Sequence, residues 1–85
     1  MNPAILTTIE SRIKAAQYIY GPIASTHEAL GVALEEWNEL QQAIHINGAS
    51  AIRRECCDLA AILIRLAEAC AEPSEEFARR SGFTK

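Results

Sequence analysis

The chain has 85 residues, 49% of them apolar and 22% charged, and its formal net charge is −3. A chain of this length forms one domain with a modest core, and such small domains often recruit a second copy to complete it. The negative charge argues against binding to DNA or RNA, which requires a basic face, but not against a nucleotide, because a bound metal can reverse the local charge. We therefore expect one domain over residues 1–85 and no nucleic-acid polymer as a partner.

The N-terminal segment and the cysteines predict a cytoplasmic protein. The first fourteen residues are interrupted by charges, unlike a secretory signal, and no stretch is long and apolar enough to span a membrane. Cys56, Cys57 and Cys70 show no CxxC spacing, and adjacent cysteines in a helix are poorly placed to bond to each other. We expect reduced, mostly packing thiols and no membrane partner.

Apolar residues at helical spacing predict a first helix from about Pro3 to Tyr20. Asn2 is a suitable N-cap, Pro3 suits the first helical position, and Gly21-Pro22 ends the helix. The apolar stripe of this helix consists of Ile5, Leu6, Ile9, Ile13, Ala16 and Tyr20.

A second helix is predicted from about Thr26 to Ile46. Ser25 and Glu28 have the spacing of a capping box, and Asn47-Gly48 supplies a left-handed stop. The expected apolar stripe consists of Leu30, Ala33, Leu34, Trp37, Leu40 and Ile44. Trp37 lies near its centre, where core packing is the expectation and stacking on a nucleobase is the alternative.

A third helix is predicted from about Ala49 or Ser50 to Ala71. Pro73 prevents its continuation, and Ser74 can cap a short helix through Arg80. The predicted fold is all-α: an antiparallel helical hairpin with an N-terminal helix and a short C-terminal helix.

The third helix is apolar around nearly its whole circumference. Between Cys56 and Ala67 its only charges are Asp58 and Arg65. A helix of this kind is buried on all sides, and the other helices of one chain cannot easily surround it. We therefore expect a homodimer or homotetramer that completes a helix bundle.

Two pairs of acidic residues are spaced by one helical turn. Glu36 and Glu39 form one pair in the second helix, and Glu55 and Asp58 form the other in the third. In an antiparallel hairpin these four carboxylates can meet, where two charges about 5 Å apart repel by roughly 3 kcal/mol at an effective dielectric near 20. Such a cluster favours a site for Mg²⁺, with Mn²⁺ as a substitute.

The alternative for these acids is a solvated acidic face. Asp58 would then pair with an arginine, for which Arg53, Arg54 and Arg65 are the candidates.

The segments EEWNEL and ECCDLAAILIRLAEA, separated by fifteen residues after Glu39, resemble the MazG-like all-α nucleoside triphosphate pyrophosphohydrolase superfamily. The resemblance covers about residues 26–71 and rests on EExxE followed by ExxD with an apolar run. It implies that Glu36, Glu39, Glu55 and Asp58 ligate magnesium and that Glu35 supports the ligands or helps to place water.

The same resemblance implies cleavage of a nucleoside triphosphate between its α and β phosphates, with Glu36 or Glu39 activating the water. Such enzymes carry basic residues after the second acidic helix, and the candidates here are Arg65, two turns after Asp58, and then Arg79 and Arg80. The alternative function is a non-catalytic, oligomeric helical interaction or regulatory module, or a degenerate family member that binds nucleotides without hydrolysing them.

Overall fold

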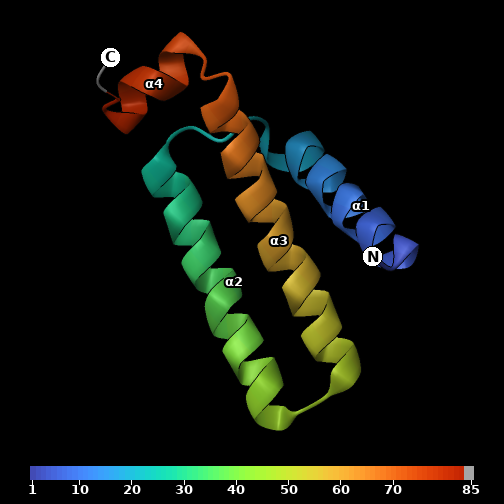
Figure 1. Cartoon of the computed structure of the whole chain (residues 1–85). Coiled ribbons are helices and arrows are strands. Elements are labelled where there is room, and N and C mark those ends of the chain that lie inside the picture. Colours follow the sequence, from blue (N-terminus) through green and yellow to red (C-terminus); the bar gives the residue numbers. More distant parts are fainter. Residues whose placement is uncertain (84–85) are drawn as a thin grey trace.

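A computed structural model describes residues 1–83 and contains four helices in this part of the chain (Figure 1). They are α1 (Pro3–Tyr20), α2 (Thr26–Ile46), α3 (Ala49–Ala71) and α4 (Glu75–Ser81). No strand occurs among the described residues, so the all-α prediction is confirmed. The predicted helix bounds also agree with the structure, and α4 continues one residue beyond Arg80.

Side-chain caps explain where the first two helices begin. The Asn2 side chain accepts a hydrogen bond from the backbone N–H of Ala4 at 2.8 Å, and Ser25 Oγ accepts one from the N–H of Glu28 at 3.1 Å. Only half of the predicted capping box forms, because the Glu28 carboxylate accepts from the N–H of Ala24. These caps satisfy backbone donors that have no partner within the helix.

The α2–α3 hairpin depends on a left-handed residue. Asn47 has φ 64°, a conformation that asparagine tolerates better than most side chains, and its N–H bonds to the carbonyl of Ala43. The chain reverses there, and α2 and α3 run antiparallel along their length (Figure 1).

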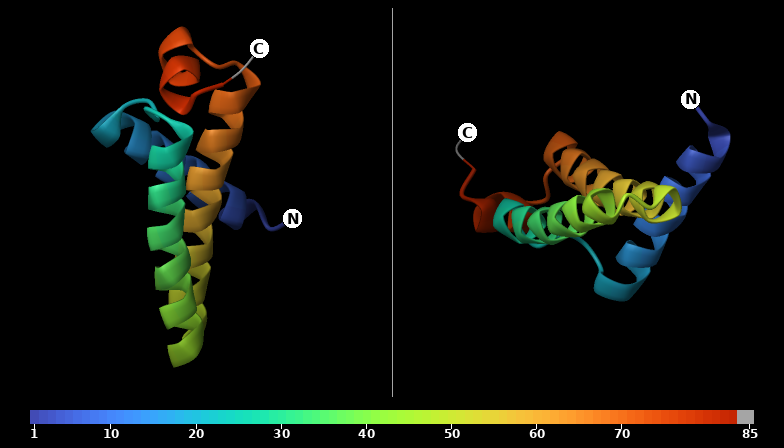
Figure 2. Two further views of the ribbon diagram at one scale, coloured as in Figure 1. Left: turned by 90° about the vertical axis from the view of Figure 1, so that its left-hand side faces the viewer. Right: turned by 90° about the horizontal axis from the view of Figure 1, so that it is seen from below.

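The remaining helices pack on this hairpin in different ways. Helix α1 crosses one side of the hairpin and packs mainly on α3, while α4 folds over the end where α2 begins (Figure 2). Phe77 of α4 joins Ile23, Ala29 and Ile62 in a small buried cluster, and Ser81 Oγ accepts a hydrogen bond from the N–H of Thr26. This cluster lies where α2 begins, and Leu40 and Ala43 continue the buried core toward the other end of α2.

Only part of the expected apolar stripe of α2 packs in the core, namely Leu40 and Ala33. Ala29, Leu40 and Ala43 are buried there, whereas Trp37 is 49% exposed and Leu34 is 53% exposed. The prediction that Trp37 belongs to the core is wrong for the single chain. The physical reason is a rotation of α2 that turns its small residues toward α3, where they permit close contact between the helices.

The hairpin consequently carries an exposed apolar surface on the side away from α1, which we call the open apolar face. It comprises Leu30, Leu34, Trp37 and Ile44 of α2 and Cys56, Leu63 and Cys70 of α3. On α3 the buried residues are Cys57, Ala61 and Ile62, so α1 and α2 cover only part of this helix. The expectation that α3 cannot be enclosed by its own chain agrees with this exposure.

Candidate functional site

Three glutamates converge where α2 and α3 run side by side. One carboxylate oxygen from each of Glu36, Glu39 and Glu55 lies within 4.8 Å of the other two. Glu39 and Glu55 are each eight residues from Asn47, so the hairpin brings them to the same level. The one-turn spacing of Glu36 from Glu39 then places the third carboxylate beside them. We call these three residues the carboxylate cluster.

Burial and the neighbouring carboxylates disfavour the charged forms of Glu36 and Glu39. Burial, followed by the charges of Glu39 and Asp58, raises the pKa of Glu36 to about 7. A hydrogen bond with Glu55 is the main cause that raises the pKa of Glu39. The carboxylates therefore hold on to protons that relieve their mutual repulsion, and a cation could replace these protons.

Two oxygens of the cluster have no partner. The Oε2 atoms of Glu36 and Glu55 are shielded from solvent and accept no hydrogen bond. The other Glu55 oxygen, Oε1, lies 3.4 Å from Nε of Arg54, its neighbour in the chain. Buried acceptors without a donor are unfavourable, and a bound cation would satisfy them.

Asp58 lies apart from the three clustered glutamates and pairs with α1. Its Oδ1 is 3.2 Å from Nε of Arg12, so the arginine partner is neither Arg53, Arg54 nor Arg65. Sequence reasoning missed Arg12. Its spacing from Ile9 and Ala16 places it beside the apolar stripe of α1, which was the available signal.

A cleft of about 740 Å³ lies between α1 and the hairpin, next to the cluster. Its charged side chains are Arg12, Glu28, Glu35, Glu36, Asp58 and Arg65. Its other lining residues are Ala15, Ala16, Ile19, Tyr20, Ile23, Ala29, Val32, Ala61 and Ile62. The cleft thus combines charged residues with an apolar wall, as small-molecule sites commonly do.

The predicted phosphate ligands occupy different places. Arg65 lines the cleft, and its guanidinium donates a hydrogen bond to the carbonyl oxygen of Gly21 at 2.8 Å. Arg79 and Arg80 lie on α4, pair with Glu76 at 3.1 and 2.7 Å, and do not line the cleft. The structure brings Arg65 to the candidate site and leaves the two α4 arginines outside it.

The predicted base-stacking residue also lies elsewhere. Trp37 belongs to the open apolar face and is not part of the cleft. Glu36 and Trp37 are adjacent in the chain, and a step of about 100° around the helix points their side chains to different sides of α2.

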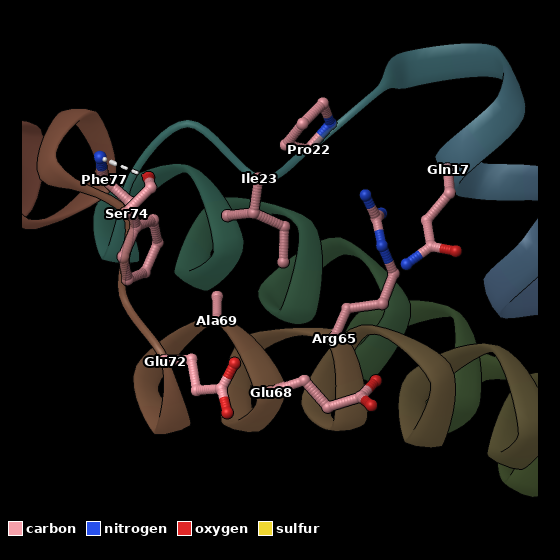
Figure 3. A pocket seen from close by; sticks show the side chains of 9 residues that line it. All are labelled: Gln17, Pro22, Ile23, Arg65, Glu68, Ala69, Glu72, Ser74 and Phe77. Atoms are coloured by element: carbon pink, nitrogen blue, oxygen red, sulfur yellow. Dashed lines mark hydrogen bonds between the residues drawn. The ribbon is translucent and has the colours of Figure 1, made fainter.

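A smaller pocket of about 280 Å³ lies near α4, between Phe77 and Gln17 (Figure 3). Arg65 borders this pocket too, and its guanidinium lies beside the Gln17 side chain in the view. The acids at its rim, Glu68 and Glu72, belong to no group of three potential metal ligands among residues 1–83. The pocket therefore lacks the chemistry that distinguishes the larger cleft.

The donor set of the cluster suits a hard divalent cation. Mg²⁺ binds oxygen at about 2.1 Å in octahedral geometry, so opposite ligands lie about 4.2 Å apart. Carboxylate oxygens within 4.8 Å of one another need only a small side-chain adjustment to reach that spacing. Glu35, Glu36 and Asp58 face the cleft, so a cation at the cluster would lie at its edge.

Comparison with known proteins identifies no relative: no family model, curated protein or solved structure matches the chain. Within residues 1–83, no helix combines the length and the apolar character needed to cross a bilayer.

Proposed function

We propose that this protein is a Mg²⁺-dependent nucleotide pyrophosphohydrolase of the MazG-like type, which cleaves a nucleoside triphosphate to the monophosphate and pyrophosphate. The observation that carries the proposal is the convergence of Glu36, Glu39 and Glu55, with two partnerless oxygens, beside a cleft that contains arginine. Mn²⁺ would serve as a substitute cation, and the reduced cysteines suit the cytoplasm.

In this proposal the carboxylate cluster binds the cation and the cleft binds the nucleotide. Mg²⁺ at the cluster would neutralise phosphate charge and lower the pKa of a bound water. Glu36, Glu39 and Glu55 would hold the ion. Asp58, the fourth predicted ligand, would have to move toward it from the cleft wall, and Glu35 at that wall would orient water near the phosphates. Glu36 or Glu39 would take the proton from the attacking water.

The nucleobase would occupy the apolar part of the cleft. Ile19, Tyr20 and Ile23 line that part, at the end of α1 and the start of the α1–α2 connection. These side chains replace Trp37 as the proposed base contacts, because Trp37 lies outside the cleft.

The direct test is incubation of the purified protein with NTPs, dNTPs and Mg²⁺, followed by detection of monophosphate and pyrophosphate. Glu39→Gln and Asp58→Asn should abolish product formation, while Glu10→Gln on the exposed part of α1 serves as the matched control. An absence of turnover with every nucleotide, together with an absence of Mg²⁺ binding, would refute the proposal.

We also propose that two or more copies associate through the open apolar face. Support comes from its large, partly exposed side chains on two adjacent helices, including Leu34, Trp37 and Leu63. Contiguous apolar surface of this kind is a common feature of protein interfaces. Burying it between antiparallel hairpins would complete a helix bundle, as expected for a homodimer or homotetramer.

This face also favours the second candidate function, a non-catalytic helical interaction or regulatory module. Thermal unfolding with and without Mg²⁺ separates the two candidates. A cation site stabilises the protein by mass action, whereas exposed acids respond weakly and without preference for Mg²⁺ over other salts.

A further inference from the structure

We propose that Arg12 is a phosphate-binding residue, seated by Asp58 at the cleft so that its guanidinium faces a triphosphate bound there. This inference rests on the proposed function, since it assigns a further residue to the same site. It names an arginine on α1, a helix outside the segment that carries the acidic motif.

Position is the first argument. Of the basic residues in the described chain, Arg12 and Arg65 line the cleft. The Arg65 guanidinium is committed to the Gly21 carbonyl at 2.8 Å, a contact that fixes the α1–α2 connection. Arg12 pairs only with a carboxylate at the cleft wall and is therefore the cation better placed to bind a ligand.

The donors of Arg12 are the second argument. Its guanidinium has five N–H donors, and the contact with Asp58 involves Nε. The Arg12 side chain is 47% exposed and lines the cleft, so part of it is accessible to a ligand there. A planar pair of guanidinium N–H groups matches two phosphate oxygens.

Asp58 provides the third argument, because it lines the same cleft as Glu36 of the carboxylate cluster. Its Oδ1 lies 3.2 Å from Nε of Arg12, so it holds this side chain at the wall of that cleft. A triphosphate bound between Arg12 and a cation at the cluster would have its charge offset from both sides.

A purely structural role for the ion pair is a weaker explanation. The side chains of Arg12 and Asp58 are 47% and 27% exposed, and ion pairs of this exposure contribute little to stability. Binding of a nucleotide gives the arginine a further role, because its phosphates carry more negative charge than the metal alone neutralises.

The test measures binding without turnover. Wild-type protein, Arg12→Gln and Arg12→Lys are titrated by calorimetry with Mg²⁺ alone, and then with a nucleoside triphosphate analogue that resists α–β cleavage in the presence of Mg²⁺. Lys14→Gln is the matched control, because Lys14 is an exposed cation of the same helix that does not line the cleft.

We expect Arg12→Gln to weaken binding of the analogue roughly ten- to a hundredfold, the loss of charge-assisted hydrogen bonds. Arg12→Lys should lose less, because it keeps the charge without the paired donors. Affinity for Mg²⁺ alone should not fall in either variant. If Arg12→Gln does not fold, as judged by circular dichroism, the Arg12→Lys comparison carries the test.

Two results would overturn the assignment, and they differ in what they imply. Equal binding of the analogue by wild type and by the Arg12 variants would refute the role of Arg12 and leave the proposed function intact. A wild-type protein that binds neither Mg²⁺ nor the analogue would refute both. Loss of Mg²⁺ binding in the Arg12 variants would show instead that Arg12 supports the fold of the cluster, which also overturns the assignment.

Discussion

The two sides of the α2–α3 hairpin are built from the same helices but have opposite chemistry. On the side of α1 the hairpin presents the carboxylate cluster and a cleft that contains arginine. On the other side it presents Leu34, Trp37 and Leu63, each about half exposed. On the acidic side, burial and then the neighbouring charges raise the pKa of Glu36, whereas the apolar side carries surface that water solvates poorly. The first side is suited to a small charged ligand, and the second to another protein surface.

The largest effect should come from the acidic side. Glu55→Gln removes a negative ligand from the cluster without changing its shape, and we expect hydrolysis to fall by at least about a hundredfold. The measurement is pyrophosphate release at saturating Mg²⁺, with Glu10→Gln as the control. Activity of Glu55→Gln close to that of wild type would remove the α3 carboxylate from the proposed mechanism.

Mg²⁺ should also stabilise the fold. At about a hundred times its Kd, a ligand specific for the folded state adds about 2.7 kcal/mol to the free energy of unfolding. The midpoint of thermal or urea unfolding should therefore rise when Mg²⁺ is added to the wild type, and rise much less in Glu39→Gln. Equal shifts in both proteins would indicate a general salt effect.

A charge introduced at the centre of the open apolar face should weaken the association between copies of the chain. Leu34→Glu places a carboxylate on the open apolar face, and we expect the copies to dissociate at least tenfold more readily while the helix content stays unchanged. Sedimentation velocity and circular dichroism measure the two properties. Gln42→Glu, an exposed change on α2 outside the open apolar face, is the matched control. A wild-type protein that is monomeric at micromolar concentration would contradict the proposed assembly.

A smaller effect is expected for pH: without added metal, the free energy of unfolding should fall as the pH rises. The pKa of Glu36 is about 7 in the folded chain and near its ordinary value of 4.5 when unfolded, so between these pH values the folded state binds more protons. Stability from this group is complete below pH 4.5 and declines as pH rises to about 7. We expect wild type to lose unfolding free energy from pH 5 to pH 8 and Glu36→Gln to lose less. Identical pH profiles of the two proteins would show that folding does not raise the pKa of Glu36.

The smallest expected effect comes from a substitution that lowers stability without altering either side of the hairpin. Ser25→Ala removes the N-cap of α2 and should cost about 1 kcal/mol, which corresponds to a lower Tm by about 4–8 °C. Mg²⁺ affinity of the folded protein should be unchanged, as calorimetry below the transition would measure. A parallel loss of Mg²⁺ affinity would instead mean that the cluster depends on the start of α2.

The helix bounds could be predicted because their signals are local. Asn2, Ser25, Asn47 and Ser74 act within one turn of their own position, so the sequence is sufficient to place them. The carboxylate cluster was also predictable, since a hairpin about Asn47 aligns residues at equal distances from the turn. Three of the four expected acids meet in this way.

The remaining features depend on how the helices pack. Whether Trp37 or Leu40 faces α3 is decided by the rotation of α2, and large and small apolar residues compete for that face in ways that spacing alone does not resolve. The pairing of Arg12 with Asp58 depends on the angle at which α1 crosses the hairpin. Neither property is encoded within a single helical turn.

The attachment of α1 has a consequence for how the ligand preference of the cleft could diversify. Helix α1 meets the hairpin mainly through α3 and is joined to α2 by the short connection of residues 21–25. It contributes one wall of the cleft, whereas the carboxylate cluster belongs wholly to the other two helices. Changing side chains of α1 other than Arg12 could therefore alter which molecule the cleft accepts without altering the three carboxylates of the cluster.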